Sequence, residues 1–171
     1  MTNKEPMAEL MVEHEGGEVT PWAQVRELMR KGGTYWLATV RPDGRPHVVP
    51  VGPAWVGDDL FFTTGQGTVK GNNLAHNPHC VLILTTDGYD LVVEGEAAKM
   101  NDEQRLQLVA EAYVAQDWPA YVHDGVLDAP FSAPTTGPAP YDVYEMTPTV
   151  AFAFGTEEAT VYSTTRYRFE R

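Results

Sequence analysis

The spacing of hydrophobic positions predicts one helix near the start of the chain. Apolar residues between positions 22 and 29 recur every three or four residues, which is the spacing of one helix face. Thr20 is suited to cap this helix and Pro21 to occupy its first position. Lys31 and Gly32 are typical of a helix end, so we expect the helix to finish near Arg30.

From Thr34 onward the pattern changes to short runs of aromatic and β-branched residues, which are typical of strands. Turn residues separate the runs, notably Pro42-Asp43-Gly44 and Gly57-Asp58-Asp59, and their close spacing favours an antiparallel meander. The predicted strands cover residues 34–40, 46–56, 60–64, 79–86, 89–99, 141–147, 149–154 and 160–169.

Two further helices interrupt the predicted strands. A short one opens from the glycine-containing loop at residues 65–71 and stops at Asn77-Pro78. A longer one runs from Asn101 to Gln116, with Asn101 placed to cap it and Gln104 placed to complete a capping box. Residues 117–140 contain five prolines, and a loop of this length is either a lid or binding segment, or an ordered wrap over a sheet edge.

The composition is that of one folded domain. The chain has 171 residues, of which 43% are hydrophobic and 11% aromatic, enough for a substantial buried core. Many short strands with few helices predict a mainly β fold, an antiparallel β-barrel with peripheral helices. We predict a mobile N-terminal tail over residues 1–19 and a single domain over residues 20–171.

Charge and hydropathy exclude several classes of function. Twelve basic against 24 acidic residues give a formal net charge of -12, so long-range attraction to nucleic acid or to an anionic membrane is not expected. No apolar run approaches the roughly 20 residues needed to span a membrane. The acidic N-terminus also lacks the basic start and apolar core of a signal peptide. We therefore predict a cytoplasmic protein with neither nucleic-acid nor membrane partners.

The segment from Thr63 to Lys70 carries the strongest candidate chemistry. It joins a predicted strand to a helix through glycines and places the hydroxyls of Thr63, Thr64 and Thr68 near the junction. A helix N-terminus offers unpaired N–H donors and a partial positive charge, and Lys70 adds a full charge. These features predict a phosphate site, although the order of residues is not that of a Walker loop. The alternative is an ordinary strand-turn-helix with a solvated lysine.

The strand that begins at Pro46 is unusual because three prolines, at positions 46, 50 and 53, interrupt it. Proline removes ladder donors and is confined to edge strands, strand starts and bulges. The segment is therefore either a simple edge strand or a strand whose free backbone groups face a flat ligand. His47 is either a contact to a phosphate or a ring, or a structural residue.

Other candidate groups point to no catalytic or metal site. Cys80 is the only cysteine and lies in an apolar run, so we expect a buried thiol and no internal disulfide. His76, His79 and Cys80 are close in sequence, but they straddle Pro78 and no second cluster completes a ligand set. We predict no metal site and identify no catalytic acid, base or nucleophile.

Several segments together resemble one known family. The run from Trp36 to Val51 resembles the opening hairpin of the pyridoxamine 5'-phosphate oxidase-like split-barrel family. Residues 61–64 and 70–78 are similar to the phosphate-loop segment of that family, through Phe61-Phe62-Thr63-Thr64, Lys70, Asn73-Leu74 and Asn77-Pro78. Residues 90–97 resemble its next core strand, and residues 165–169 resemble the closing strand of its actinobacterial branch, which includes deazaflavin-dependent oxidoreductases.

The resemblance implies an antiparallel split barrel that forms a homodimer, with a flavin-type cofactor at the interface, either FMN or the deazaflavin coenzyme F420. It places the isoalloxazine ring along the backbone of His47, Val48, Val49, Pro50 and Val51. It places the ribityl phosphate against Thr63, Thr64, Thr68 and Lys70, with Asn73 nearby. Arg166 and Tyr167 match residues that extend to the cofactor from the partner chain.

The function that the resemblance implies is a flavin- or deazaflavin-dependent oxidoreductase that transfers a hydride to or from an unknown small organic substrate. That substrate would lie over the ring, near Trp118 and Tyr121. The alternative is a non-catalytic protein that binds or stores flavin, haem or tetrapyrrole. Val69 and His47 stand where FMN binders of the family commonly carry further basic residues, so the choice between FMN and deazaflavin stays open.

Overall fold

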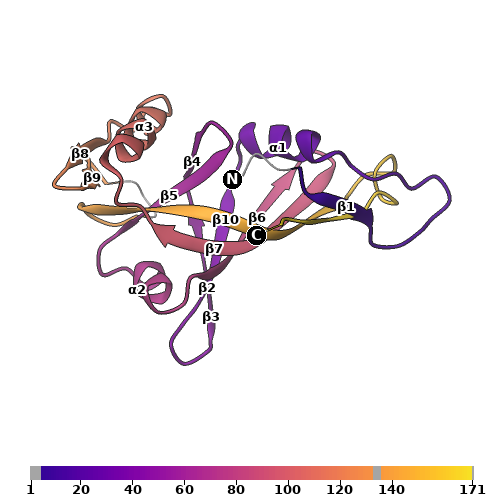
Figure 1. Cartoon of the computed structure of the whole chain (residues 1–171), viewed down its shortest axis with the longest axis horizontal. Helices are drawn as coiled ribbons and strands as arrows, with labels where there is room; N and C mark the ends of the chain where they lie inside the picture. The colour runs from indigo at the N-terminus through magenta and orange to yellow at the C-terminus, as the bar shows by residue number, and fades with distance from the viewer. Residues whose placement is uncertain (1–4, 133–135, 171) are drawn as a thin grey trace.

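Antiparallel strands dominate the computed structural model, which describes residues 5–132 and 136–170 (Figure 1). The helices in these ranges are α1 (Trp22–Arg30), α2 (Val69–His76) and α3 (Glu103–Val114). The strands are β1 (Met7–Leu10), β2 (Tyr35–Val40), β3 (Pro46–Val51), β4 (Pro53–Val56), β5 (Asp59–Gly65), β6 (His79–Thr86), β7 (Tyr89–Lys99), β8 (Tyr121–His123), β9 (Val126–Asp128), β10 (Tyr141–Gly155) and β11 (Thr165–Arg168). The predicted mainly β, antiparallel fold is confirmed.

The sheet order explains why the barrel is split. The strands run β1-β11-β10-β7-β6-β2-β3, while β4 pairs with β5 and β5 pairs with the first half of β10. β3 continues through Gly52 into β4. Because β4 pairs with β5 and β5 pairs with β10, the chain returns to the main sheet and the strands curve around a barrel. Within the described ranges no ladder joins β3 to β4, so the sheet stays open at this point.

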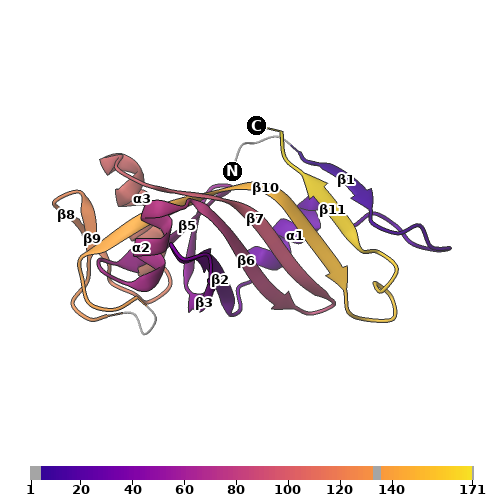
Figure 2. The same ribbon diagram turned by 90° about the horizontal axis from the view of Figure 1, so that it is seen from below.

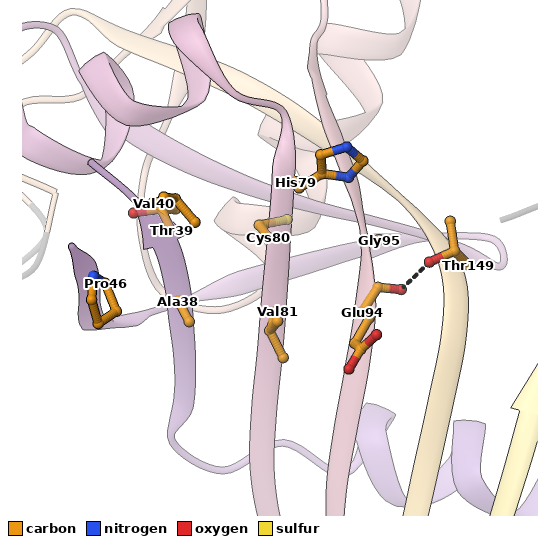
Figure 3. Close-up of a pocket in the computed structure, with 10 residues that line it drawn as sticks. All are labelled: Ala38, Thr39, Val40, Pro46, His79, Cys80, Val81, Glu94, Gly95 and Thr149. Carbon is orange, nitrogen blue, oxygen red and sulfur yellow. Dashed lines mark hydrogen bonds between the residues drawn. The ribbon is translucent and has the colours of Figure 1, made fainter. Parts of the chain in front are cut away.

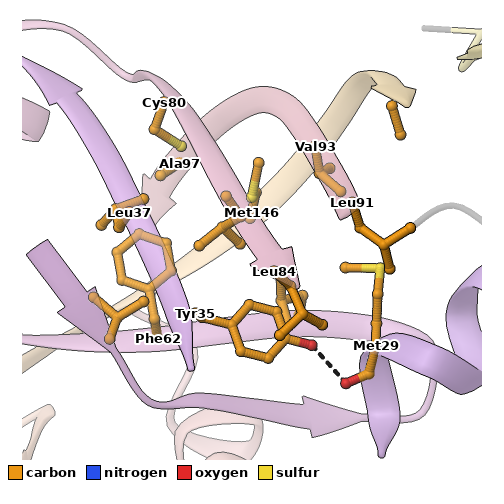
Figure 4. Packing of buried hydrophobic residues seen from close by; sticks show 14 of the residues in the cluster. Met29, Tyr35, Leu37, Phe62, Cys80, Leu84, Leu91, Val93, Ala97 and Met146 are labelled. Atoms are coloured by element: carbon orange, nitrogen blue, oxygen red, sulfur yellow. Dashed lines mark hydrogen bonds between the residues drawn. The ribbon is translucent and has the colours of Figure 1, made fainter. Parts of the chain in front are cut away.

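The barrel interior is a single apolar core that α1 closes (Figure 4). Trp22, Val25 and Met29 of α1 are buried against inward-facing residues of the sheet, which include Tyr35, Leu37, Leu84 and Leu91. The hydroxyl of Tyr35 donates to the Met29 carbonyl at 2.5 Å. The helix ends at Arg30 as predicted. Pro21 rather than Thr20 holds its cap position, and the Thr20 hydroxyl donates to Tyr89 Oη at 3.1 Å.

Helix α3 packs outside the barrel, over β4, β5 and the start of β10. Its buried residues, among them Leu106 and Tyr113, meet Phe61 and Tyr141 in a second apolar cluster. The predicted cap at Asn101 is wrong: Asp102 caps the helix, and its carboxylate accepts from Arg105 N at 2.8 Å. An ionised carboxylate is a stronger acceptor than a neutral amide, which favours the later start.

The N-terminal segment contains a strand where the sequence pattern indicates only a tail. Residues 7–10 pair with β11, and Ala8 packs against the main core. The Glu9 carboxylate lies 2.7 Å from Arg166 and 3.2 Å from Arg168. A strand of four residues is too short for its alternation to stand out in an acidic segment. Residues 1–4 of the predicted tail lie outside the described residues.

Several strands differ from the sequence prediction, and the predicted strand 160–169 is reduced to β11, Thr165–Arg168. The predicted strand 46–56 divides at Gly52, and the predicted strands 141–147 and 149–154 are one strand, β10. A bulge between Pro148 and Val150 lets β10 continue past a proline, which has no N–H for the ladder. Part of the long loop at 117–140 is the β8–β9 hairpin, and residues 133–135 of that loop lie outside the described residues. No helix of the described part is long and apolar enough to cross a membrane.

Candidate anion-binding site

The junction between β5 and α2 has the geometry expected of an anion site. Thr68 occupies the N-cap of α2, and its Oγ1 accepts from Gly71 N at 3.3 Å. The Thr64 hydroxyl lies 2.6 Å from that of Thr68, so the two side chains converge on the first turn of the helix. Figure 1 shows α2 beside the β2–β3 hairpin, which brings two distant segments of the sequence together.

Lys70 places a cation in this first turn and is not the solvated lysine of the alternative interpretation. Its side chain is buried, with 3% of the residue exposed. Burial lowers the pKa of its ammonium group because a low-dielectric environment disfavours the charged form. A desolvated cation binds an anion more strongly than one that is fully hydrated.

Two further basic side chains approach the same place from the β2–β3 hairpin. Arg41 follows β2, and its Nη2 lies 3.3 Å from His47 Nδ1 at the start of β3. Burial is the main cause that lowers the pKa of His47, and the charges of Arg41 and Lys70 lower it further. The sequence pattern did not single out Arg41, which lies in the same tight hairpin, two residues after Thr39, the residue that pairs with His47.

Asn73 fastens α2 to the hairpin. Its Nδ2 donates to Thr39 Oγ1 at 2.9 Å, and both residues are buried. Thr39 lies opposite His47 in the β2–β3 register. Asn73 therefore holds the helix that carries Lys70 against the β2–β3 hairpin, which carries Arg41 and His47.

Thr63 is separated from the other predicted phosphate contacts. Successive residues of a strand point to opposite faces, so Thr63 and Thr64 cannot both turn their side chains to the same group. Thr64 faces Thr68, whereas Thr63 interacts with the buried hydroxyl of Tyr113 on α3. The structure thus brings together Thr64, Thr68, Lys70, Asn73 and His47, and places the Thr63 side chain elsewhere.

The predicted ring-binding segment forms the strand β3, which is the last strand of the sheet path. Alternation places His47, Val49 and Val51 on the inner face and Val48 and Pro50 on the opposite one. Val48 is 49% exposed and Val51 is buried. The edge position leaves one side of the strand without a ladder in the described structure, as the proline pattern indicates.

A groove of about 250 Å³ lies next to this site, over β2, β6 and β7 (Figure 3). It includes Thr39, Pro46 and Cys80, and the Thr149 hydroxyl donates to the Glu94 carbonyl at its far side, at 3.2 Å. The Cys80 thiol is buried, and burial raises its pKa to about 12. The described residues hold no group of three or more His, Cys, Asp or Glu side chains that could bind a metal ion.

Two residues expected near a cofactor lie in the core. Tyr167 is fully buried and its hydroxyl donates to the Thr20 carbonyl at 2.6 Å, so it cannot extend to a partner chain. Trp118 is buried between the rings of Tyr113 and Tyr141, at 5.0 and 5.1 Å. Period-two alternation along β11 puts Tyr167 and Arg166 on opposite faces, and this alternation is the signal in the sequence that separates the two residues.

Comparison with known proteins finds one family model that matches most of the chain. A family model described as pyridoxamine 5'-phosphate oxidase matches residues 21–154. No curated protein matches the chain.

Several solved structures share the fold at low sequence identity. A NimC/NimA family protein from Clostridium acetobutylicum has a TM-score of 0.64 and 17% identity, covering 86% of this chain and 92% of that chain. A heme binding protein from Mycobacterium smegmatis has a TM-score of 0.59 and 15% identity, covering 86% and 57%. An F420 reductase has a TM-score of 0.51 and 24% identity, covering 74% and 94%. At these identities the likeness concerns the fold alone, and it agrees with a split barrel.

Proposed function

Because the chain belongs to the pyridoxamine 5'-phosphate oxidase family, as the resemblance predicted, we propose that it is a flavin- or deazaflavin-dependent oxidoreductase. In this proposal it transfers a hydride to or from a small organic substrate. The observation that carries the proposal is the buried Lys70, in the first turn of α2, next to the paired hydroxyls of Thr64 and Thr68. Neutral donors around one desolvated cation suit a phosphate group.

The residues present fit the phosphate end of such a cofactor. Thr64, Thr68 and the first N–H groups of α2 supply donors, and Lys70 supplies charge. Asn73 fixes the helix against Thr39, and the edge strand β3 offers backbone along which a flat ring can lie. When bound, a flavin or deazaflavin supplies the hydride chemistry, so this chain's own residues have to bind, orient and exclude water.

We also propose that the protein is a homodimer, with the cofactor at the interface. The sheet face opposite the α1 core carries apolar residues in register across β3, β2, β6, β7 and β10. One such row contains Pro50, Trp36, Ile83, Val92 and Phe152. Trp36 is 44% exposed, and contiguous apolar patches of this kind mark interaction sites. A second copy is the partner that members of this family take, and β3 borders the patch.

Two solved structures of similar fold carry names that differ in role. One is named an F420 reductase and another a heme binding protein. The named haem binder supports a second candidate function, in which the chain holds a flavin, haem or tetrapyrrole without turnover. The two functions differ in whether bound, reduced cofactor passes its hydride to an acceptor.

A titration of purified protein tests the proposed site. We expect FMN or coenzyme F420 to bind with a change in fluorescence, and Lys70→Ala to weaken binding roughly tenfold to a hundredfold, since a charge-assisted contact contributes about 1.5–3 kcal/mol. Lys31→Ala is the matched control, because Lys31 is exposed beyond the end of α1. An unchanged dissociation constant for folded Lys70→Ala would refute the phosphate site.

A second measurement separates the enzyme from the storage protein. Loaded with reduced cofactor, an oxidoreductase should reduce an artificial dye and return the cofactor to its oxidised spectrum. Tight binding with no reoxidation by any acceptor would favour the storage function. Binding of haem in place of either flavin would have the same consequence.

A further inference from the structure

Side chains at the end of α3 hold the sheet at the point where the barrel is split. The hydroxyl of Tyr113, in the last turn of this helix, donates to the Gly52 carbonyl at 2.9 Å. Gln116, just beyond the helix, donates from Nε2 to the Pro53 carbonyl at 3.3 Å. Gly52 joins β3 to β4, and no ladder connects these two strands in the described ranges. The two side chains therefore supply hydrogen bonds at a point that lacks a ladder.

Packing from α1 does not restrain this connection. A groove of about 480 Å³ lies between the end of α1 and the end of α3, and its lining includes Gly52, Pro53 and Trp55. A Cβ at Gly52 would meet no atom within 4 Å, so the backbone here has room to shift. Val51 pairs with β2 and Pro53 pairs with β5. Between these two ladders, the hydrogen bonds from α3 fix where the connection lies.

The Tyr113 side chain is itself held firmly. It is 4% exposed, and its ring packs edge-to-face on Trp118 with 5.0 Å between the ring centroids. The Trp118 indole N–H donates in turn to the Phe131 carbonyl at 3.2 Å. A side chain that packing has already locked can fix a partner with little further loss of entropy. The Tyr113 hydroxyl is therefore preorganised to hold the Gly52 carbonyl.

This hydroxyl lies at the joint between the two halves of the candidate cofactor site. Gly52 directly follows β3, the strand predicted to carry the ring. Pro53 pairs with Phe62 of β5, and the residue after Phe62, Thr63, interacts with the same Tyr113 hydroxyl. β5 leads directly into the candidate anion site at the start of α2. A ligand that contacts both strands binds best when their spacing matches its own length.

We propose that Tyr113 is a positioning residue, whose hydroxyl sets the spacing between β3 and the β5–α2 junction. It acts through the Gly52 carbonyl and does not touch the cofactor itself. The inference rests on the proposed function, to which it adds a buried residue outside the candidate contacts. Loss of this hydroxyl should then affect the bound cofactor, whereas loss of an equally buried hydroxyl elsewhere should not.

The experiment removes one hydroxyl at a time. Tyr113→Phe keeps the ring against Trp118 and loses only the hydrogen bond to Gly52. Tyr167→Phe is the matched control, because Tyr167 is also buried and donates to a backbone carbonyl, that of Thr20, at 2.6 Å. FMN and coenzyme F420 are titrated separately into the wild type and both variants. The dissociation constant and the absorption spectrum of the bound cofactor are recorded.

The two variants should differ in their effect on the cofactor. For the cofactor that binds the wild type, we expect Tyr113→Phe to weaken binding roughly twofold to tenfold, since one neutral hydrogen bond is lost. It should also shift the long-wavelength absorption band, because the ring would lie differently along β3. Tyr167→Phe should change neither the affinity nor the spectrum.

Amide hydrogen exchange of the cofactor-free proteins tests the restraint without a ligand. Exchange at residues 51–56 should be faster in Tyr113→Phe than in the wild type, because the connection between β3 and β4 opens more often. Tyr167→Phe should leave exchange at these residues unchanged. Both variants lose a buried hydrogen bond, so a difference between them reports on the position of the bond and not on overall stability.

Each outcome supports or overturns the inference. Unchanged exchange at residues 51–56 in Tyr113→Phe overturns it. A cofactor that binds this variant with unchanged affinity and spectrum overturns it too and leaves the proposed function intact, as does an equal loss of affinity in both variants. If neither cofactor binds the wild type, the proposed function fails. A selective rise in exchange would then still support Tyr113 as the residue that holds the split.

Discussion

Replacing Gly65 with alanine should destabilise the protein, because the end of β5 has no room for a side chain. A Cβ at this position would lie 2.3 Å from the Thr136 carbonyl oxygen and 3.0 Å from that of Pro138. Both are backbone atoms, and Gly65 N donates to the same Thr136 oxygen at 2.9 Å. Neither atom can swing aside as the tip of a long side chain would, so one of the two segments must move by about 1 Å.

The size of the effect follows from the cost of overpacking. Forcing an extra carbon into a well-packed site costs about 1–3 kcal/mol, through displaced backbone and weakened hydrogen bonds. In a chain of this size each kcal/mol lowers the melting temperature by about 2–4 °C. We therefore expect Gly65→Ala to melt roughly 2–12 °C below the wild type.

Thermal unfolding followed by circular dichroism measures this shift. Gly52→Ala is the control, since a Cβ at Gly52 meets nothing within 4 Å and should leave the melting temperature nearly unchanged. Gly65 also directly follows Thr64 of the candidate anion site, at the end of β5, so FMN affinity should fall in Gly65→Ala and not in Gly52→Ala. A Gly65→Ala protein that melts like the wild type would show that residues 136–138 do not pack tightly against the end of β5.

Three further outcomes follow from burial and exposure. Cys80 should not react with a thiol reagent in the folded protein at about pH 8, since it is 4% exposed and its pKa is raised to about 12, and it should react once in denaturant. Because the unfolded thiol ionises first, Cys80 should also make the free energy of unfolding fall as the pH rises from about 9 towards 12. Trp36→Glu should convert the proposed dimer into a monomer in analytical ultracentrifugation, whereas Leu108→Glu, at a similarly exposed position on α3, should not. A dimer that persists in Trp36→Glu would place the interface elsewhere.

Local pattern was sufficient to predict the elements in the middle of the chain. The strands at 79–86 and 89–99 have the predicted boundaries, because alternating apolar residues flank the Asp87-Gly88 turn. The split of the predicted strand 46–56 could not be predicted in this way. It depends on which partner each half meets, β2 before Gly52 and β5 after it, and both partners are determined by the fold as a whole.

The family resemblance predicted the candidate site in outline, but two of its details require three dimensions. Thr63 and Thr64 look equivalent in the sequence, yet pleating turns one hydroxyl toward Tyr113 and the other toward Thr68. In the sequence Tyr167 looks available to a partner chain, yet its hydroxyl donates a hydrogen bond to the Thr20 carbonyl inside the core. In both cases the residue type indicates the chemistry, and the side of the strand decides whether that chemistry is accessible.

Arg41 shows why a count of basic residues along a motif underestimates such a site. Judged by position alone, Val69 and His47 leave Lys70 as the single cation, and an acidic chain would then hold a phosphate weakly. A tight hairpin removes this difficulty, because a residue just after β2 is carried back beside the start of β3, within 3.3 Å of His47. The binding of an anion depends on all the charges that surround it in space. A turn can bring a basic side chain to the site from a position outside the linear motif.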